Sequence, residues 1–113
     1  MKFIIIIFVI SSILFANVAS ADFMTGNKLF SILEKIERRA DRTSEFDIAM
    51  ALGYIVGVYD SYEGIFYFTP GGATQGQLLN IVIKYLRENP EILHKPAHEI
   101  LLEAFKKAFP KEK

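Results

Sequence analysis

The apolar segment at residues 48–59 reads IAMALGYIVGVY and carries no charge. A membrane-spanning helix needs about 20 apolar residues, so these residues predict a helix buried within a protein instead. A glycine inside a helix costs about 1 kcal/mol relative to alanine. Because Gly53 and Gly57 lie four residues apart on one face, we expect another backbone to approach closely there. The segment therefore predicts a central apolar helix, from about Glu45 to Tyr62, surrounded by the rest of the chain.

The residues before this segment predict another helix, which begins at Thr25 or Asn27 and runs to about Arg39. Its apolar side chains recur every three or four residues, the spacing of one buried helix face. They are Leu29, Ile32, Leu33, Ile36 and Ala40. Ser44, followed three residues later by Asp47, is a variant of the capping box and starts the apolar helix.

Two more helices are predicted after the apolar segment. Thr74 and Gln77 have the spacing of a capping box, and the helix that they open ends before Pro90. The last helix has Pro96 in its first turn and stops at Pro110. The chain therefore predicts an all-α fold, a small single-domain helical bundle of about four helices.

The connection at residues 63–73, EGIFYFTPGGA, is long for a helical bundle. Pro70, Gly71 and Gly72 signal a turn. The IFYF run at residues 65–68 predicts one short strand or an extended packed segment. In either case strict alternation places Phe66 and Phe68 in the core.

Residues 1–21 have the layout of a secretory signal peptide. Lys2 supplies the positive charge, a long apolar stretch follows, and Ala19-Ser20-Ala21 offers the small residues that a signal peptidase accepts. Polar residues interrupt the apolar stretch too often for a transmembrane anchor. We therefore expect cleavage before Asp22, a mature domain at residues 22–113 without a membrane span, and a periplasmic location.

Composition excludes several classes of function. The 13 Lys and Arg residues balance 13 Asp and Glu residues, so the excess positive charge that nucleic-acid binding needs is missing. The absence of cysteine excludes disulfides, thiolate zinc sites and a cysteine nucleophile. A domain this small buries a modest share of its surface, so its stability must come from core packing, a partner or self-association as a homodimer.

Candidate chemistry is scarce. His94 and His98 have a spacing that suits a metal on a helix, but Pro96 lies between them and no third ligand is evident. Asp60 and Glu63 resemble an acid–base pair, yet a solvated helix terminus explains them equally well. We therefore predict no catalytic residue, no metal site and no cofactor, and a protein that is not an enzyme.

Aromatic residues are concentrated at the end of the apolar helix and in the connection after it. Six of the fifteen residues 54–68 are aromatic. Tyr54 and Tyr59 belong to the core by position, whereas Tyr62 and Tyr67 have a weaker case for burial. Aromatic side chains are enriched at protein interfaces. The predicted partner-binding residues are Tyr62, Glu63, Tyr67, Thr69 and Gln75; the alternative is that the loop aromatics pack against the bundle.

Three stretches, in the same order, resemble the Rap/Tai family of immunity proteins. They are TGNKLFSIL at residues 25–33, ALGYIVGVYD at residues 51–60, and FTPGGATQGQLLNIVIKYLRENPEILHKPAHEILLEAFKKAFP at residues 68–110. The resemblance implies a periplasmic immunity protein that neutralises a peptidoglycan amidase toxin delivered by type VI secretion. It also implies that the GYIVGVYD residues Gly53, Tyr54, Gly57 and Asp60 are structural.

The chain departs from this family in its cysteines. Family members typically carry cysteines near the positions of Leu33, Ala51, Phe68 and Lys111, and this chain has none. The resemblance then implies that apolar packing replaces the disulfides at the first three positions. Since loss of a native disulfide typically costs 2–5 kcal/mol, we expect compensation elsewhere.

Two non-enzymatic classes of function remain. The leading hypothesis is an inhibitor that occludes the active-site cleft of an amidase toxin with the connection at residues 63–73. The alternative is a small periplasmic helical chaperone of the acid-resistance type, which would expose apolar surface when its carboxylates are protonated at low pH.

Overall fold

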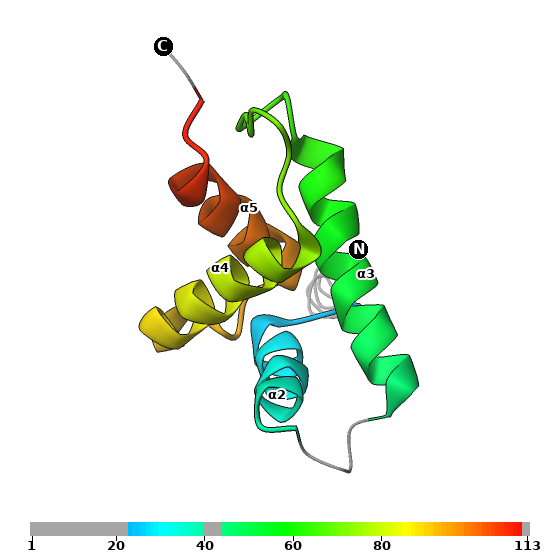
Figure 1. Ribbon diagram of the computed structural model, residues 1–113. Coiled ribbons are helices and arrows are strands. Elements are labelled where there is room, and N and C mark those ends of the chain that lie inside the picture. The colour runs from blue at the N-terminus through cyan, green and yellow to red at the C-terminus, as the bar shows by residue number, and fades with distance from the viewer. Residues whose placement is uncertain (1–22, 40–43, 112–113) are drawn as a thin grey trace, which may run out of the picture.

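The structure is a computed structural model that describes residues 23–39 and 44–111. Its helices are α2 (Gly26–Glu37), α3 (Glu45–Tyr62), α4 (Gln75–Glu88), the short 3-10 helix η1 (Pro90–Ile92) and α5 (Ala97–Ala108) (Figure 1). The described residues contain two isolated β-bridges and no named strand. The prediction of an all-α domain with four main helices is confirmed. The predicted signal peptide and Ala40 lie outside the described residues.

The helix starts follow the predicted caps. Thr25 caps α2 and Ser44 caps α3, because the side-chain oxygen of each accepts a hydrogen bond from the backbone N–H three residues later. At α4 the capping box is complete: the Gln77 N–H donates to Thr74 Oγ1 at 3.2 Å, and the Thr74 N–H donates to Gln77 Oε1 at 2.8 Å. Pro96 precedes α5 as its N-cap instead of lying in the first turn.

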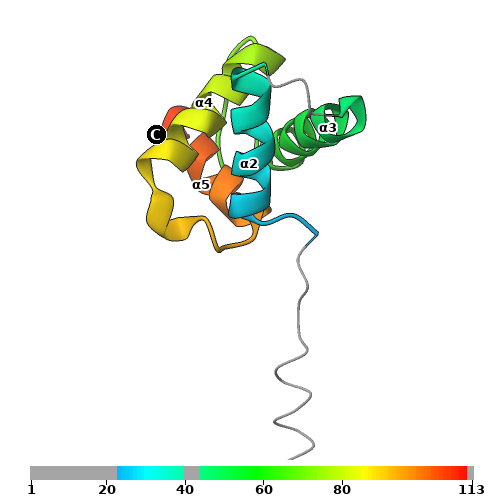
Figure 2. The same ribbon diagram turned by 90° about the horizontal axis from the view of Figure 1, so that it is seen from below.

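Helix α3 is not sheathed by the rest of the chain, so this part of the fold prediction is wrong. It contacts α2, α4 and α5, yet Figure 2 shows α3 beside the group that these three helices form. Consequently only one face is buried, at Ala51, Ile55 and Tyr59. Gly53 and Gly57 lie on the exposed face. Within the described residues, no helix has the length and apolar character that crossing a membrane requires.

The reason that we gave for the two helical glycines is also wrong. A Cβ atom added at Gly53 or Gly57 would find no other atom within 4 Å, so no backbone approaches either residue. The close approach occurs instead at Gly26, the first residue of α2. A Cβ atom there would lie 2.7 Å from the Leu93 carbonyl oxygen and 2.5 Å from Ile100 Cδ1.

Backbone hydrogen bonds explain why residues 93–95 lie so close to Gly26. Gly26 N–H donates to the Lys95 carbonyl at 3.0 Å, and Asn27 N–H donates to the Leu93 carbonyl at 2.7 Å. Ala97 N–H completes the connection by donating to the Met24 carbonyl at 2.9 Å. These bonds join the start of α2 to the segment that precedes α5, which encloses one end of the core.

The core consists of apolar side chains from all four α-helices. Leu33 and Ala51, two of the positions where the family resemblance implies cysteine, are fully buried. Apolar side chains therefore occupy the core at these two positions. No charged or polar residue belongs to the buried set among the described residues, so apolar burial is the main source of the stability of the bundle.

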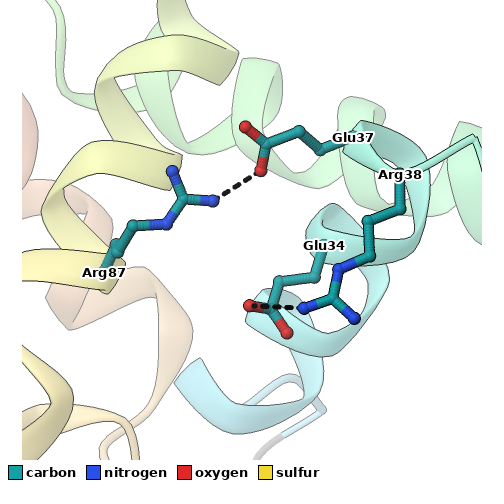
Figure 3. Close-up of polar contacts among 4 residues, drawn as sticks. All are labelled: Glu34, Glu37, Arg38 and Arg87. Atoms are coloured by element: carbon teal, nitrogen blue, oxygen red, sulfur yellow. Dashed lines mark hydrogen bonds and ion pairs between the residues drawn. The ribbon is translucent and has the colours of Figure 1, made fainter.

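An exposed ion pair joins α2 to α4. Arg87 contacts Glu37 at 2.5 Å across the two helices, while Arg38, the C-cap of α2, lies 3.9 Å from Glu34 (Figure 3). Exposed ion pairs typically contribute about 0–1 kcal/mol. The orientation of α2 on α4 is therefore determined by the apolar core and not by these charges.

We predict that Gly26→Ala lowers the free energy of unfolding by about 1–3 kcal/mol, because the added methyl group must displace the Leu93 backbone. The matched variant Gly53→Ala should instead raise it, by up to about 1 kcal/mol, because the site is open and alanine favours a helix. Urea denaturation followed by circular dichroism measures both. A neutral Gly26→Ala would contradict the close packing that we describe.

Candidate partner-binding site

We call residues 63–73 the aromatic loop. It leaves the C-terminal end of α3 and leads into α4, and Figure 1 shows it at the same end of the molecule as the chain that follows α5. The loop is folded by turns and not by a strand: residues 64–66 form a turn, and Gly64, Gly71 and Gly72 have positive φ angles. The conformation at these three positions is one that glycine adopts without steric cost.

The turn after α3 determines which side chains of the loop face the core. The N–H groups of Ile65 and Phe66 donate to the Tyr62 carbonyl at 3.0 and 3.1 Å, and Gly64 N–H donates to the Tyr67 carbonyl at 2.8 Å. Extended chain resumes only after this turn, so alternation starts at Tyr67 and not one residue earlier. Tyr67 points inward, and Phe68 points outward.

The predicted burial of the loop aromatics is therefore out of register by one residue. Phe66 and Phe68, which we expected in the core, are 44% and 47% exposed. Ile65 is 59% exposed. Phe68 also stands at the third position where a cysteine of related proteins was expected to be replaced by apolar packing, and that expectation is wrong for it.

Tyr67 anchors the loop to the core. Its side chain is 0% exposed, so in this conformation it offers no surface to the predicted partner. Its hydroxyl donates to the Tyr59 carbonyl at 2.6 Å. Its ring stacks on that of Tyr59 at 5.6 Å and lies 5.7 Å from that of Phe105. Burial, together with the nearby Tyr59 and Glu63, raises the pKa of the Tyr67 hydroxyl well above its usual value.

The other four predicted contact residues divide into two groups. Glu63 and Thr69 are half-buried, and the Thr69 N–H donates to Glu63 Oε1 at 3.4 Å, which links the two sides of the loop. Tyr62 is half-buried and packs edge-on against the Phe66 ring at 5.4 Å. Gln75 is exposed at the first position of α4. Tyr62 thus borders the exposed part of the loop at Phe66.

Three large apolar side chains of the loop are exposed, Ile65, Phe66 and Phe68, and we call them the loop patch. Aromatic side chains are enriched at protein interfaces. The sequence did not predict the exposure of these three residues, because inward and outward side chains were assumed to alternate without interruption along residues 65–68. The signal that could have revealed them is Gly64, which marks a turn directly before the IFYF run.

A shallow groove lies along α3 and reaches Tyr62, the residue before the loop. It has a volume of about 370 Å³, and it is lined by Tyr54, Gly57, Val58, Ser61, Tyr62 and His98. Tyr62 belongs to both the groove and the contact with Phe66, so the two features adjoin. Asp60 is exposed near the end of α3, and Tyr54 is half-buried.

The polar side chains singled out for chemistry do not gather into a site. His94 and His98 are both exposed. Residues 23–39 and 44–111 contain no group of three or more His, Asp or Glu side chains that could hold a metal ion. The feature that these residues offer for recognition is the loop patch.

The described residues form a small helical domain with exposed apolar side chains on the loop between α3 and α4. A family model described as Rap1a immunity proteins matches residues 25–110, from the N-cap of α2 to just beyond α5. The chain therefore belongs to the family of Rap1a immunity proteins, as its resemblance to the Rap/Tai family implied. No curated protein matches the chain by sequence similarity.

We predict that Tyr67→Phe lowers the free energy of unfolding by about 0.5–1.5 kcal/mol at neutral pH, because the hydrogen bond to the Tyr59 carbonyl is lost. The raised pKa adds a pH dependence. Above pH 10 the unfolded chain releases the Tyr67 proton while the folded chain retains it, so the wild type loses stability as the pH rises.

The Tyr67→Phe variant has no hydroxyl at this position, so it cannot lose stability at alkaline pH by this route. Urea denaturation between pH 8 and pH 11 should therefore give a shallower decline for the variant than for the wild type. Equal slopes would contradict the burial of the Tyr67 hydroxyl.

Proposed function

We propose that this protein is an exported immunity protein that binds a peptidoglycan amidase toxin of a type VI secretion system. The loop patch enters the active-site cleft of the toxin and occludes it. Membership of an immunity-protein family supports a toxin as the partner. The choice of surface rests on one observation. Ile65, Phe66 and Phe68 are exposed, although Tyr67 in the same loop is fully buried and holds the loop in place.

The energetics of the loop patch suit this role. Moving a phenylalanine side chain from water into a buried site is worth about 1.5–3 kcal/mol, and aromatic side chains at the centre of an interface often dominate affinity. A loop that is already held in its binding conformation loses less conformational entropy on binding. Tyr67 supplies part of this preorganisation.

Inhibition by occlusion requires no chemistry from the immunity protein. It requires only that the complex forms faster than the toxin damages the cell wall and that it dissociates slowly. The role is therefore that of a stoichiometric, non-enzymatic inhibitor.

The proposed location is the periplasm, where the peptidoglycan substrate of such a toxin lies. The support is the signal-peptide pattern at residues 1–21. Mass spectrometry of the protein from a periplasmic extract should find Asp22 as its first residue; a cytoplasmic product that retains residue 1 would contradict export. The homodimer considered from the sequence stays a prediction, which analytical ultracentrifugation measures.

We predict that the wild-type protein inhibits at least one member of a panel of purified type VI peptidoglycan amidases. Phe66→Ala and Phe68→Ala should each raise the Kd of that complex about tenfold or more, because each removes a large apolar contact. Calorimetric titration measures the affinity, and release of peptide from peptidoglycan measures the inhibition.

Phe46→Ala is the matched control, since Phe46 is 73% exposed at the other end of α3. Its Kd should equal that of the wild type. An equal loss of affinity in Phe46→Ala and Phe66→Ala would contradict the loop patch as the binding surface. The absence of binding to every amidase, together with no loss of protection from sibling cells when the gene is deleted, would overturn the proposed function itself.

A further inference from the structure

The chain that follows α5 contacts the aromatic loop at several points. Phe109, the C-cap of α5, places its ring 6.3 Å from that of Tyr67 and 6.0 Å from that of Tyr59. Lys111 Nζ donates to the Ile65 carbonyl at 3.3 Å. The C-terminal segment thus touches both the anchor of the loop and the turn that carries the loop patch.

Phe109 also contacts the second half of the loop. It lines a groove together with Thr69, Gly72 and Ala73, at the point where the chain enters α4. Phe109 is half-buried and packs against the core. Its position is itself fixed, because its N–H donates to the Phe105 carbonyl at 2.8 Å at the end of α5.

The loop needs such support because its own bonding is sparse. Apart from the turn after α3, the loop has one internal bond between backbone groups, from Gly72 N–H to the Thr69 carbonyl at 3.0 Å. Its three glycines with positive φ give the unfolded loop more conformational freedom than other residues would. Contacts from outside the loop must therefore hold it in one conformation.

We propose that Phe109 and Lys111 form a brace that positions the loop patch for binding. In this role they determine the affinity for the toxin through the conformation of the loop and are positioning residues. The inference rests on the proposed function for its consequence in binding, but the brace itself is a property of the free protein. The two parts can therefore be tested separately.

The first experiment measures hydrogen exchange in the free protein, expressed from the full chain. Phe109→Ala should speed exchange at the amides of Gly64 and Phe66 about tenfold or more, because opening of the loop becomes easier. Phe30→Ala is the matched control: Phe30 is also half-buried and packed against the core, but it lies on α2. It should leave these two amides unchanged relative to the others. If both variants speed exchange equally throughout the chain, the effect is general loss of stability and the brace is wrong.

The second variant, Lys111→Met, removes the donor to the Ile65 carbonyl while keeping a long side chain. It should speed exchange at the loop amides less than Phe109→Ala, and Lys111→Arg, which retains a donor, should restore the wild-type rate. Unchanged exchange in both Phe109→Ala and Lys111→Met would overturn the brace.

The third experiment measures binding kinetics against the panel amidase that the wild type inhibits. If only a fraction of the loop keeps the competent conformation, the apparent Kd rises by the inverse of that fraction. Phe109→Ala should therefore lower the association rate constant, about tenfold if one tenth of the loop remains competent, with little change in the dissociation rate constant.

The outcomes separate the two proposals. An increase in the dissociation rate constant alone would make Phe109 a contact residue and would overturn its positioning role. Faster loop exchange with unchanged affinity would overturn the link between brace and binding. If the wild type binds no amidase, the proposed function fails, while the exchange rates still decide whether the brace exists.

Discussion

The carbonyl group of Tyr59 joins the helical scaffold to the aromatic loop. It accepts the N–H of Glu63, which ends α3, and the hydroxyl of Tyr67, which anchors the loop. The rings of Tyr59, Tyr67 and Phe105 pack around this point at centroid distances of 5.5–5.7 Å, within the range of favourable aromatic pairs. Everything that the loop presents to a partner depends on this connection, because the residues on either side of Tyr67 are exposed.

The parts of the fold that depend on local chemistry could be predicted from the sequence. The bounds of α3 and the caps at Ser44 and Thr74 agree with expectation. A capping side-chain oxygen accepts a hydrogen bond from a backbone N–H three residues later, and this local contact does not depend on where the helix packs. The arrangement around α3 could not be predicted in the same way. An uncharged helix indicates that apolar contacts are available to it, but the number of neighbours that cover it depends on the directions of the other helices.

The site shows the same division between local and tertiary information. The aromatic density that marks the loop is visible in the sequence. The direction in which each ring faces is not visible there. The turn at Gly64 shifts the alternation of inward and outward side chains by one residue, so Tyr67 faces the core while Phe66 and Phe68 are exposed. Gly26 was missed for a different reason: its close neighbour Leu93 is 67 positions away in the chain, and no pattern in the sequence reports that contact.

Because the chain has no cysteine, the loop is held by noncovalent contacts, among them aromatic packing. The family resemblance implies cysteines near Phe68 and Lys111, one in the loop and one in the C-terminal segment, and this chain has neither. Here the hydrogen bond from Lys111 to Ile65 spans the same two segments, but an exposed lysine contributes far less than the 2–5 kcal/mol typical of a native disulfide. The greater part of the compensation must therefore come from buried apolar surface, and Phe109 against Tyr59 and Tyr67 is where the described residues provide it. Packing of this kind holds the loop without a fixed bond, so the stability of the scaffold and the readiness of the loop patch depend on the same rings.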